Sequence, residues 1–258
     1  MSKNHKEAKQ EVAVVETTKE LSTHVEPIEG AEEEILTSMI KLPRLSLQQK
    51  MSKPVENELA KVGDLFENLG NTVVCPKDQP FVFIPLKLRN VITTYLVEGQ
   101  KKTYVSQVPR TKKNEKDEWD SKGPKGEIYK NLPETIVYML AAKDLEEGNP
   151  TFPYVFTFRG ASMPKGGKSI YTNKLLLDSS MLPFYSYKFR MTSSKEEKDN
   201  NTFQVAHVER LNEKLDPKHF ETCKRWIATI ETMKVEVTED DEINTEAQGA
   251  SVVTKEQF

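Results

Sequence analysis

The residues most suggestive of phosphate chemistry are Gly167, Lys168 and Ser169, which follow an aromatic strand-like run and precede a helix-like run. A phosphate-binding P-loop, GxxxxGK[ST], occurs in this context because its backbone N–H groups and its lysine surround the phosphates. The spacing requires glycine at position 162, where this chain has serine, and Gly160 lies two residues too early. Repeated βαβ units are also missing. A nucleotide-binding enzyme is therefore the least supported function, although the loop could still hold a nucleic-acid phosphate.

Other catalytic or metal-binding patterns are absent from the sequence. The four histidines are scattered and have no metal-ligand spacing, and no Ser-His-Asp, Cys-His or paired-carboxylate arrangement can be assigned. Cys75 and Cys223 belong to no CxxC pair, so we expect two reduced, passive thiols. The sequence thus predicts a protein that is not an enzyme, with no catalytic residues, no metal and no cofactor.

The segment from residue 99 to residue 130 combines cations and aromatic rings in a stretch too polar to form a core. Backbone-tracking cations interleaved with stacking rings are typical of proteins that bind single-stranded nucleic acids, where each stacked base contributes roughly 1–3 kcal/mol. The alternative is a long exposed loop whose tryptophan folds back onto the body. The candidate contacts in this segment are Lys101, Lys102, Arg110, Lys112 and Lys113 for charge, and Tyr104 and Trp119 for stacking.

Strand-like runs elsewhere supply further candidate contacts. In an extended strand, alternate side chains share one face, and the face that carries cations is the one expected to meet phosphate. This argument selects Lys87, Arg89, Lys188 and Arg190 for charge, with Tyr185 for stacking.

The elements that must position these residues are predicted mainly from residues 152–210. An aromatic alternation at 152–159 indicates a strand, residues 170–179 can form a helix, and runs at 184–191 and 202–208 indicate a hairpin. Strand, helix and hairpin in this order fit the second half of a five-stranded, antiparallel OB-like barrel. Earlier runs at 81–89 and 91–97 are expected to form an antiparallel pair. Asp216-Pro217 predicts the start of a C-terminal amphipathic helix that packs on the barrel.

Charge divides the chain into three parts. Residues 1–40 carry a net charge of −5 and residues 235–258 a net charge of −6, whereas residues 41–234 carry +8. We interpret these parts as a disordered acidic N-terminal tail, an OB-like nucleic-acid-binding domain and an acidic C-terminal tail. No run of eighteen apolar residues could span a membrane, and the polar first thirty residues do not form a signal peptide.

Several short motifs, in order, resemble those of bacteriophage proteins regarded as single-stranded-DNA-binding proteins. The resemblance covers about residues 41–210. Its motifs are Pro43-x-Leu45 with Gln49, Ser52-x-x-Val55, Lys61-x-Gly63-Asp64, Phe83-Ile84-Pro85-Leu86, Pro153-Tyr154 and Leu182-Pro183-Phe184-Tyr185. The resemblance implies sequence-tolerant binding and protection of single-stranded DNA during phage replication or recombination, in the cytoplasm of the bacterial host.

The C-terminal tail suggests a second kind of partner. Acidic Asp240, Asp241 and Glu242 precede a terminal aromatic residue, Phe258, and this arrangement is similar to tails that recruit polymerase or primase. The ring can enter an apolar pocket while the carboxylates meet a basic rim. The sequence leaves self-association open. A non-enzymatic virion or scaffolding protein is the main alternative function.

Overall fold

The computed structural model describes residues 41–99, 101–114, 119–198 and 201–233. The predicted acidic tails lie outside the described residues. The strands are β1 (Arg44–Leu47), β2 (Leu65–Glu67), β3 (Thr72–Cys75), β4 (Phe81–Glu98), β5 (Lys101–Pro109), β6 (Trp119–Lys122), β7 (Ile128–Ala141), β8 (Tyr154–Phe158), β9 (Tyr187–Lys198) and β10 (Asn201–Lys214). The helices are α1 (Lys53–Glu56), α2 (Ala142–Glu147), η2 (Met163–Gly167), α3 (Lys168–Ser179), η3 (Phe184–Ser186), η4 (Pro217–His219) and α4 (Phe220–Thr232).

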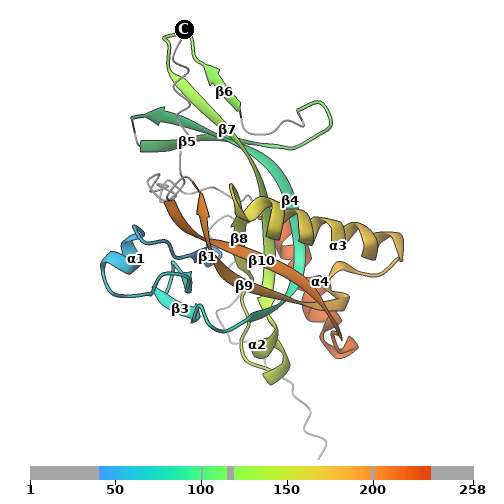
Figure 1. The fold of residues 1–258 in the computed structure, drawn as a ribbon. Coiled ribbons are helices and arrows are strands. Elements are labelled where there is room, and N and C mark those ends of the chain that lie inside the picture. Colours follow the sequence, from blue (N-terminus) through green and yellow to red (C-terminus); the bar gives the residue numbers. More distant parts are fainter. Residues whose placement is uncertain (1–40, 100, 115–118, 199–200, 234–258) are drawn as a thin grey trace, which may run out of the picture. The chain divides into compact units, whose positions relative to one another are not determined.

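The strands form one mixed sheet of ten strands that curls into a half-barrel (Figure 1). Its main path runs β10-β9-β4-β7-β8-β1-β2-β3, with β5 paired to β4 and β6 paired to β7. The β1–β8 pair is parallel, with Leu45 opposite Phe156, whereas the other pairs are antiparallel. The prediction of a five-stranded antiparallel OB-like barrel is therefore wrong.

Two physical features explain the error. Residues 81–98 form one continuous 18-residue strand, β4, because Asn90 stays extended where we expected a break between two paired strands. The polar segment after β4 also forms strands, β5 and β6, which pair across short turns, with Glu98 opposite Lys101 and Lys122 opposite Ile128. Their polar composition lacks the apolar alternation by which a strand is recognised. The predicted helix at 170–179 is confirmed as α3, and the predicted start at Asp216-Pro217 leads through η4 into α4.

The two faces of the sheet bury separate cores. Alternation along β4 sends Phe81 and Phe83 to one face and Ile84 and Leu86 to the other. On the first face the aromatic cluster also contains Ile170 and Leu177 of α3. On the second face the cluster includes Cys223 and Ile230 of α4. The two longer helices thus cover opposite faces of the sheet (Figure 1).

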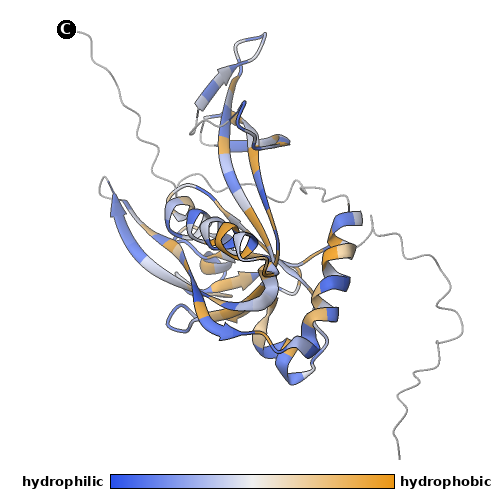
Figure 2. Cartoon of the chain, turned by 90° about the vertical axis from the view of Figure 1, so that its right-hand side faces the viewer, coloured by the Kyte–Doolittle hydropathy of each residue, from blue (hydrophilic) through white to orange (hydrophobic). Residues whose placement is uncertain are grey.

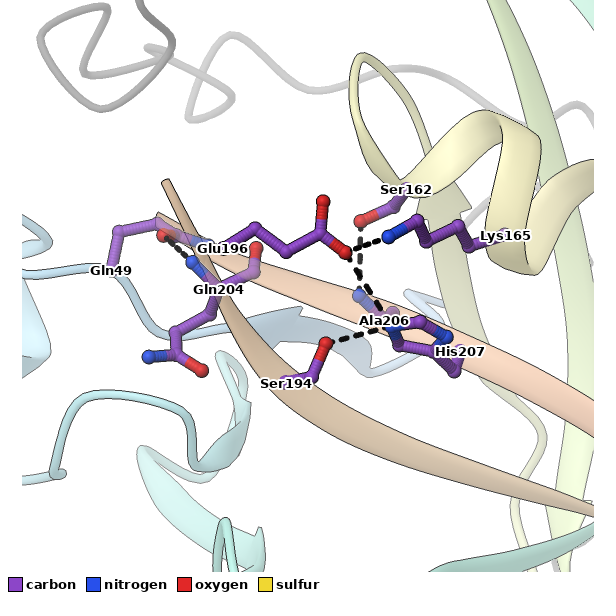
Figure 3. Close-up of polar contacts among 8 residues, drawn as sticks. All are labelled: Gln49, Ser162, Lys165, Ser194, Glu196, Gln204, Ala206 and His207. Carbon is purple, nitrogen blue, oxygen red and sulfur yellow. Dashed lines mark hydrogen bonds and ion pairs between the residues drawn. The ribbon is translucent and has the colours of Figure 1, made fainter. Parts of the chain in front are cut away.

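The outer edge of β10 is paired with side chains instead of a strand (Figure 3). The side-chain amide of Gln49 takes the place of a neighbouring strand. It accepts a hydrogen bond from Gln204 N (2.8 Å) and donates one to Gln204 O (3.0 Å). Ala206 N donates to Ser162 Oγ (3.1 Å), and the Ser169 hydroxyl donates to Val208 O (2.7 Å). These bonds satisfy backbone groups that an uncovered edge would leave open to another strand.

Cys223 lies within the second core and is fully buried. Burial raises the pKa of its thiol from 9.0 to about 12, so the folded state keeps the proton that the unfolded state loses above pH ~9. Stability from this thiol is present below pH 9 and falls as the pH rises toward 12. Between pH 9 and pH 11, the free energy of unfolding should fall by about 2–3 kcal/mol more for the wild-type protein than for Cys223→Ala, measured by urea denaturation. Parallel curves for the two proteins would contradict this expectation.

Candidate nucleic-acid interface

Beyond the body of the sheet, the outer ends of four strands form a projection that we call the arm, residues 91–131 (Figures 1 and 2). Its strand order is β5-β4-β7-β6, since β4 pairs with both β5 and β7, and β6 pairs with β7. Asn131 is buried in the middle of the arm, where it accepts from Thr94 Oγ1 (2.8 Å) and donates to Trp119 O (3.3 Å) and Ser121 Oγ (3.1 Å). This one side chain connects three strands, so the arm is an ordered sheet and not the loop of our alternative prediction.

The arm presents rings on both of its faces. Tyr95 is buried and meets half-buried Tyr104 edge-on, at 6.5 Å between ring centroids. Burial is the main cause of the raised pKa of Tyr104. The strand register places half-buried Trp119 and Tyr129 on the opposite face, because they align with Asn131 and Leu96 and not with Tyr95. Of the two predicted stacking residues in this segment, Tyr104 and Trp119 therefore lie on different faces.

The sequence of the arm is basic, with nine lysines and arginines against six acidic residues. Of the cations chosen from the sequence, Lys101, Lys112 and Lys113 are exposed, Arg110 is half-buried and Lys102 is buried. Exposed Lys122 and Lys125, at and after the end of β6, were not among the chosen residues. The alternation of β6 would have identified Lys122 only if residues 119–122 had been recognised as a strand, and Lys125 lies in the turn that follows it.

A buried carboxylate anchors the arm to the body. Glu134 of β7 is 3% exposed and accepts hydrogen bonds from Thr93 Oγ1 (2.6 Å) and the Tyr95 hydroxyl (3.2 Å). Gln107 of β5 donates to Thr93 Oγ1 (3.1 Å). Arg159, just after β8, brings Nη1 to 3.9 Å from Glu134 Oε1. The network joins β4, β5 and β7 at the point where they leave the body.

The predicted cations of the body have acidic or carbonyl partners. Lys87 pairs with Glu231 of α4 at 2.9 Å. Arg89 donates to Ile230 O of the same helix (3.4 Å) and lies 5.4 Å from the ring centre of Tyr138. Helix α4 therefore occupies the surface on which these two cations were expected to meet phosphate.

The second pair of body cations, on β9, also has acidic partners. Lys188 contacts Glu146 (2.7 Å) and Glu213 (3.2 Å), and its hydrogen bond to Glu146 is the main cause of its raised pKa. Arg190 pairs with Glu209. The predicted stacking residue Tyr185 is buried against Phe220, with ring centroids 5.2 Å apart. These residues and the arm therefore do not form one continuous binding surface.

A polar cluster on β9 and β10 superficially suggests hydrolase chemistry (Figure 3). Ser194 Oγ lies 2.7 Å from His207 Nε2, and Glu196 Oε1 lies 3.8 Å from the same nitrogen while it pairs with Lys165. A catalytic triad needs the carboxylate on the opposite ring nitrogen, where it orients the base. The cluster instead ties the hairpin to η2.

The P-loop-like segment also has a structural role. Gly166 and Gly167 are buried in η2. The Ser169 hydroxyl donates its hydrogen bond to Val208 O and is not directed at a phosphate site. Within the described ranges, no group of three or more histidine, cysteine or acidic side chains could hold a metal ion. In the same part of the chain, no helix is long and apolar enough to cross a bilayer.

Comparison with known proteins relates the chain to a phage family. A search of curated proteins and a search of solved structures each found no match. The model of a family described as Pam3 phage gp34-like protein matches residues 13–236, most of the chain and the whole arm. The protein therefore belongs to the Pam3 phage gp34-like family.

Proposed function

We propose that this phage protein binds single-stranded DNA through the arm, in a sequence-tolerant manner. The observation that carries the proposal is the combination of a basic sequence, nine lysines and arginines against six acidic residues, with rings on both faces of a projecting sheet. Cations release counterions from the phosphate backbone, and the accessible parts of the half-buried rings Tyr104 and Trp119 can stack on unpaired bases of any sequence. The arm, and not the cations of the body, is the proposed interface, because α4 and nearby acids already engage the latter.

In the phage life cycle, such binding would coat and protect strands exposed during replication or recombination. The acidic segment at Asp240, Asp241 and Glu242, with Phe258, would recruit replication proteins such as a polymerase or primase. These tail residues lie outside the described part of the chain, so this role depends on their sequence alone.

Charge reversal on the arm tests the interface. The variant Lys112→Glu/Lys113→Glu/Lys122→Glu/Lys125→Glu changes four exposed side chains and should weaken oligothymidine binding about 100-fold at ~0.1 M salt. The plot of log affinity against log salt should become shallower by about 3 if each lysine contacts one phosphate. Fluorescence titration at several salt concentrations measures both quantities. The matched control is Lys50→Glu/Lys53→Glu, two exposed lysines next to and within α1, which should change binding only slightly.

The same titration with a duplex of matching sequence separates the competing functions. Preference for the single strand, a steep loss of affinity with salt and quenching of tryptophan emission would support the proposal. Equal, weak binding to both forms would contradict it and favour the virion or scaffolding alternative. Equal loss of affinity in the arm and α1 variants would show that the arm is not the interface.

A further inference from the structure

Helix α3 is apolar on two opposite sides, and only one of them is used by the fold. Ile170 and Leu177 are buried in the first core. On the other side, Tyr171, Leu175 and Leu176 are 41%, 50% and 53% exposed. We call this exposed side the α3 face; it consists of Lys168, Tyr171, Thr172, Leu175, Leu176, Ser179 and the flanking Asp178, all exposed. A helix that only covers a sheet needs polar residues on its outer side.

The turn after α3 extends this apolar surface. Met181 is 92% exposed and has a positive φ of 53°, a conformation that favours glycine at the end of a helix. Leu182, exposed beside it, donates its N–H to Leu177 O and so fixes the turn (2.9 Å). A strained backbone that displays a fully exposed apolar side chain is unfavourable for an isolated chain. Contact of Met181 with a partner would offset this cost.

Charge on the α3 face selects the kind of partner. Lys168 lies at the N-terminal end and Asp178 at the C-terminal end, and Lys174 on the adjoining side pairs with Asp178. The face is thus nearly neutral, and it is too apolar and too weakly charged to attract nucleic acid or the acidic tails. It complements itself, however, because a two-fold axis that crosses α3 beside position 173 brings residue 168 of one copy opposite residue 178 of the other. The same axis brings Tyr171 opposite Leu175.

We infer that the α3 face is a self-association surface, where two copies pack their α3 helices antiparallel about a two-fold axis. Tyr171 and Leu175 form the centre of the contact, with Lys168 of each copy paired to Asp178 of the other at both ends. Met181 extends toward the exposed Pro164 that precedes α3 in the second copy. Opposed helix dipoles favour the same arrangement.

Sedimentation velocity of the full chain, without nucleic acid and up to ~1 mM, tests the inference independently of DNA binding. The wild-type protein should reach twice its 29.5 kDa mass, and Leu175→Glu should be monomeric because it places two carboxylates in the apolar centre. Circular dichroism of Leu175→Glu should match the wild type, since this side chain is half exposed. The control Leu59→Glu, at an exposed apolar residue after α1, should still dimerise.

Charge exchange tests the antiparallel register. Lys168→Asp and Asp178→Lys should each raise the dimer dissociation constant about fivefold, and the double exchange should restore it to within about twofold of the wild type. A wild-type monomer at every concentration, a dimer that survives Leu175→Glu, or a double exchange no better than the single variants would overturn the inference.

Discussion

Gly166→Ala is expected to lower the free energy of unfolding by about 3 kcal/mol or more. A Cβ at this position would lie 2.2 Å and 2.5 Å from two ring carbons of Phe158 and 2.9 Å from Ala206 O. Phe158 is fully buried in the first core, and Ala206 O belongs to the backbone of β10. Neither neighbour can move without disturbing the sheet, so the substitution forces η2 away from β10.

Displacement of η2 would also break the side-chain pairing along the edge of β10. Ser162, immediately before η2, accepts the hydrogen bond of Ala206 N, and loss of this partner leaves a strand edge unsatisfied. Thermal unfolding should therefore show a midpoint about 6–12 °C below that of the wild type, with aggregation after unfolding.

The matched control for this prediction is Gly70→Ala. Its Cβ would meet one atom of the Glu67 carboxylate at 2.9 Å. This atom ends a side chain and needs to shift only slightly, so that its bonds to Leu69 N and Gly70 N can be kept. We expect Gly70→Ala to change the free energy of unfolding by no more than about 1 kcal/mol. Equal destabilisation by both substitutions would show that a general cost of losing glycine, and not the contact with Phe158 and Ala206, determines the result.

The parts of the fold that could be predicted from sequence are those defined by local signals. The helix start at Asp216-Pro217 depends on a cap and a proline, and the structure shows Asp216 accepting from Lys218 N at 3.1 Å. The hairpin of β9 and β10 pairs residues close in the chain. In contrast, the parallel insertion of β1 beside β8 joins residues 44–45 to 155–156, and no local pattern encodes that partnership.

The candidate site likewise depends on contacts between residues that are distant in the chain. Alternation correctly placed Lys87 and Arg89 on strand β4, but their partner Glu231 and the carbonyl of Ile230 lie more than 140 residues later. Charge spacing alone could not reveal that α4 covers this surface. The arm was recognisable as a basic, aromatic segment, but its sequence did not reveal that Asn131 of β7 is buried and bonded to side-chain and backbone groups of β4 and β6.

Glu134→Ala should lower the free energy of unfolding by about 3 kcal/mol, because it removes a buried carboxylate that accepts two hydrogen bonds and faces an arginine. The hydroxyls of Thr93 and Tyr95 would lose their common carboxylate, and Arg159 would lose its counter-charge. We expect a cost at the low end of the range for breaking a buried ion pair, since the Arg159 side chain is 32% exposed and can rehydrate. Urea denaturation measures the effect.

Because Glu134 joins the arm to the body, the loss of stability in Glu134→Ala should be concentrated in the arm. Hydrogen exchange of β5 and the outer part of β4 should accelerate in Glu134→Ala more than exchange of β9 and β10. Glu134→Gln retains one acceptor oxygen and should cost only about 1–2 kcal/mol.

A surface ion pair provides the control for this buried one. Glu231→Ala also removes a carboxylate, but from an exposed pair in which the side chains of Lys87 and Glu231 are 25% and 59% exposed. Such pairs contribute at most about 1 kcal/mol, so Glu231→Ala should leave stability and arm exchange nearly unchanged. If Glu134→Ala behaved like Glu231→Ala, the carboxylate would not be the anchor of the arm, and packing of Tyr95 against Tyr104 and Leu132 would have to hold it instead.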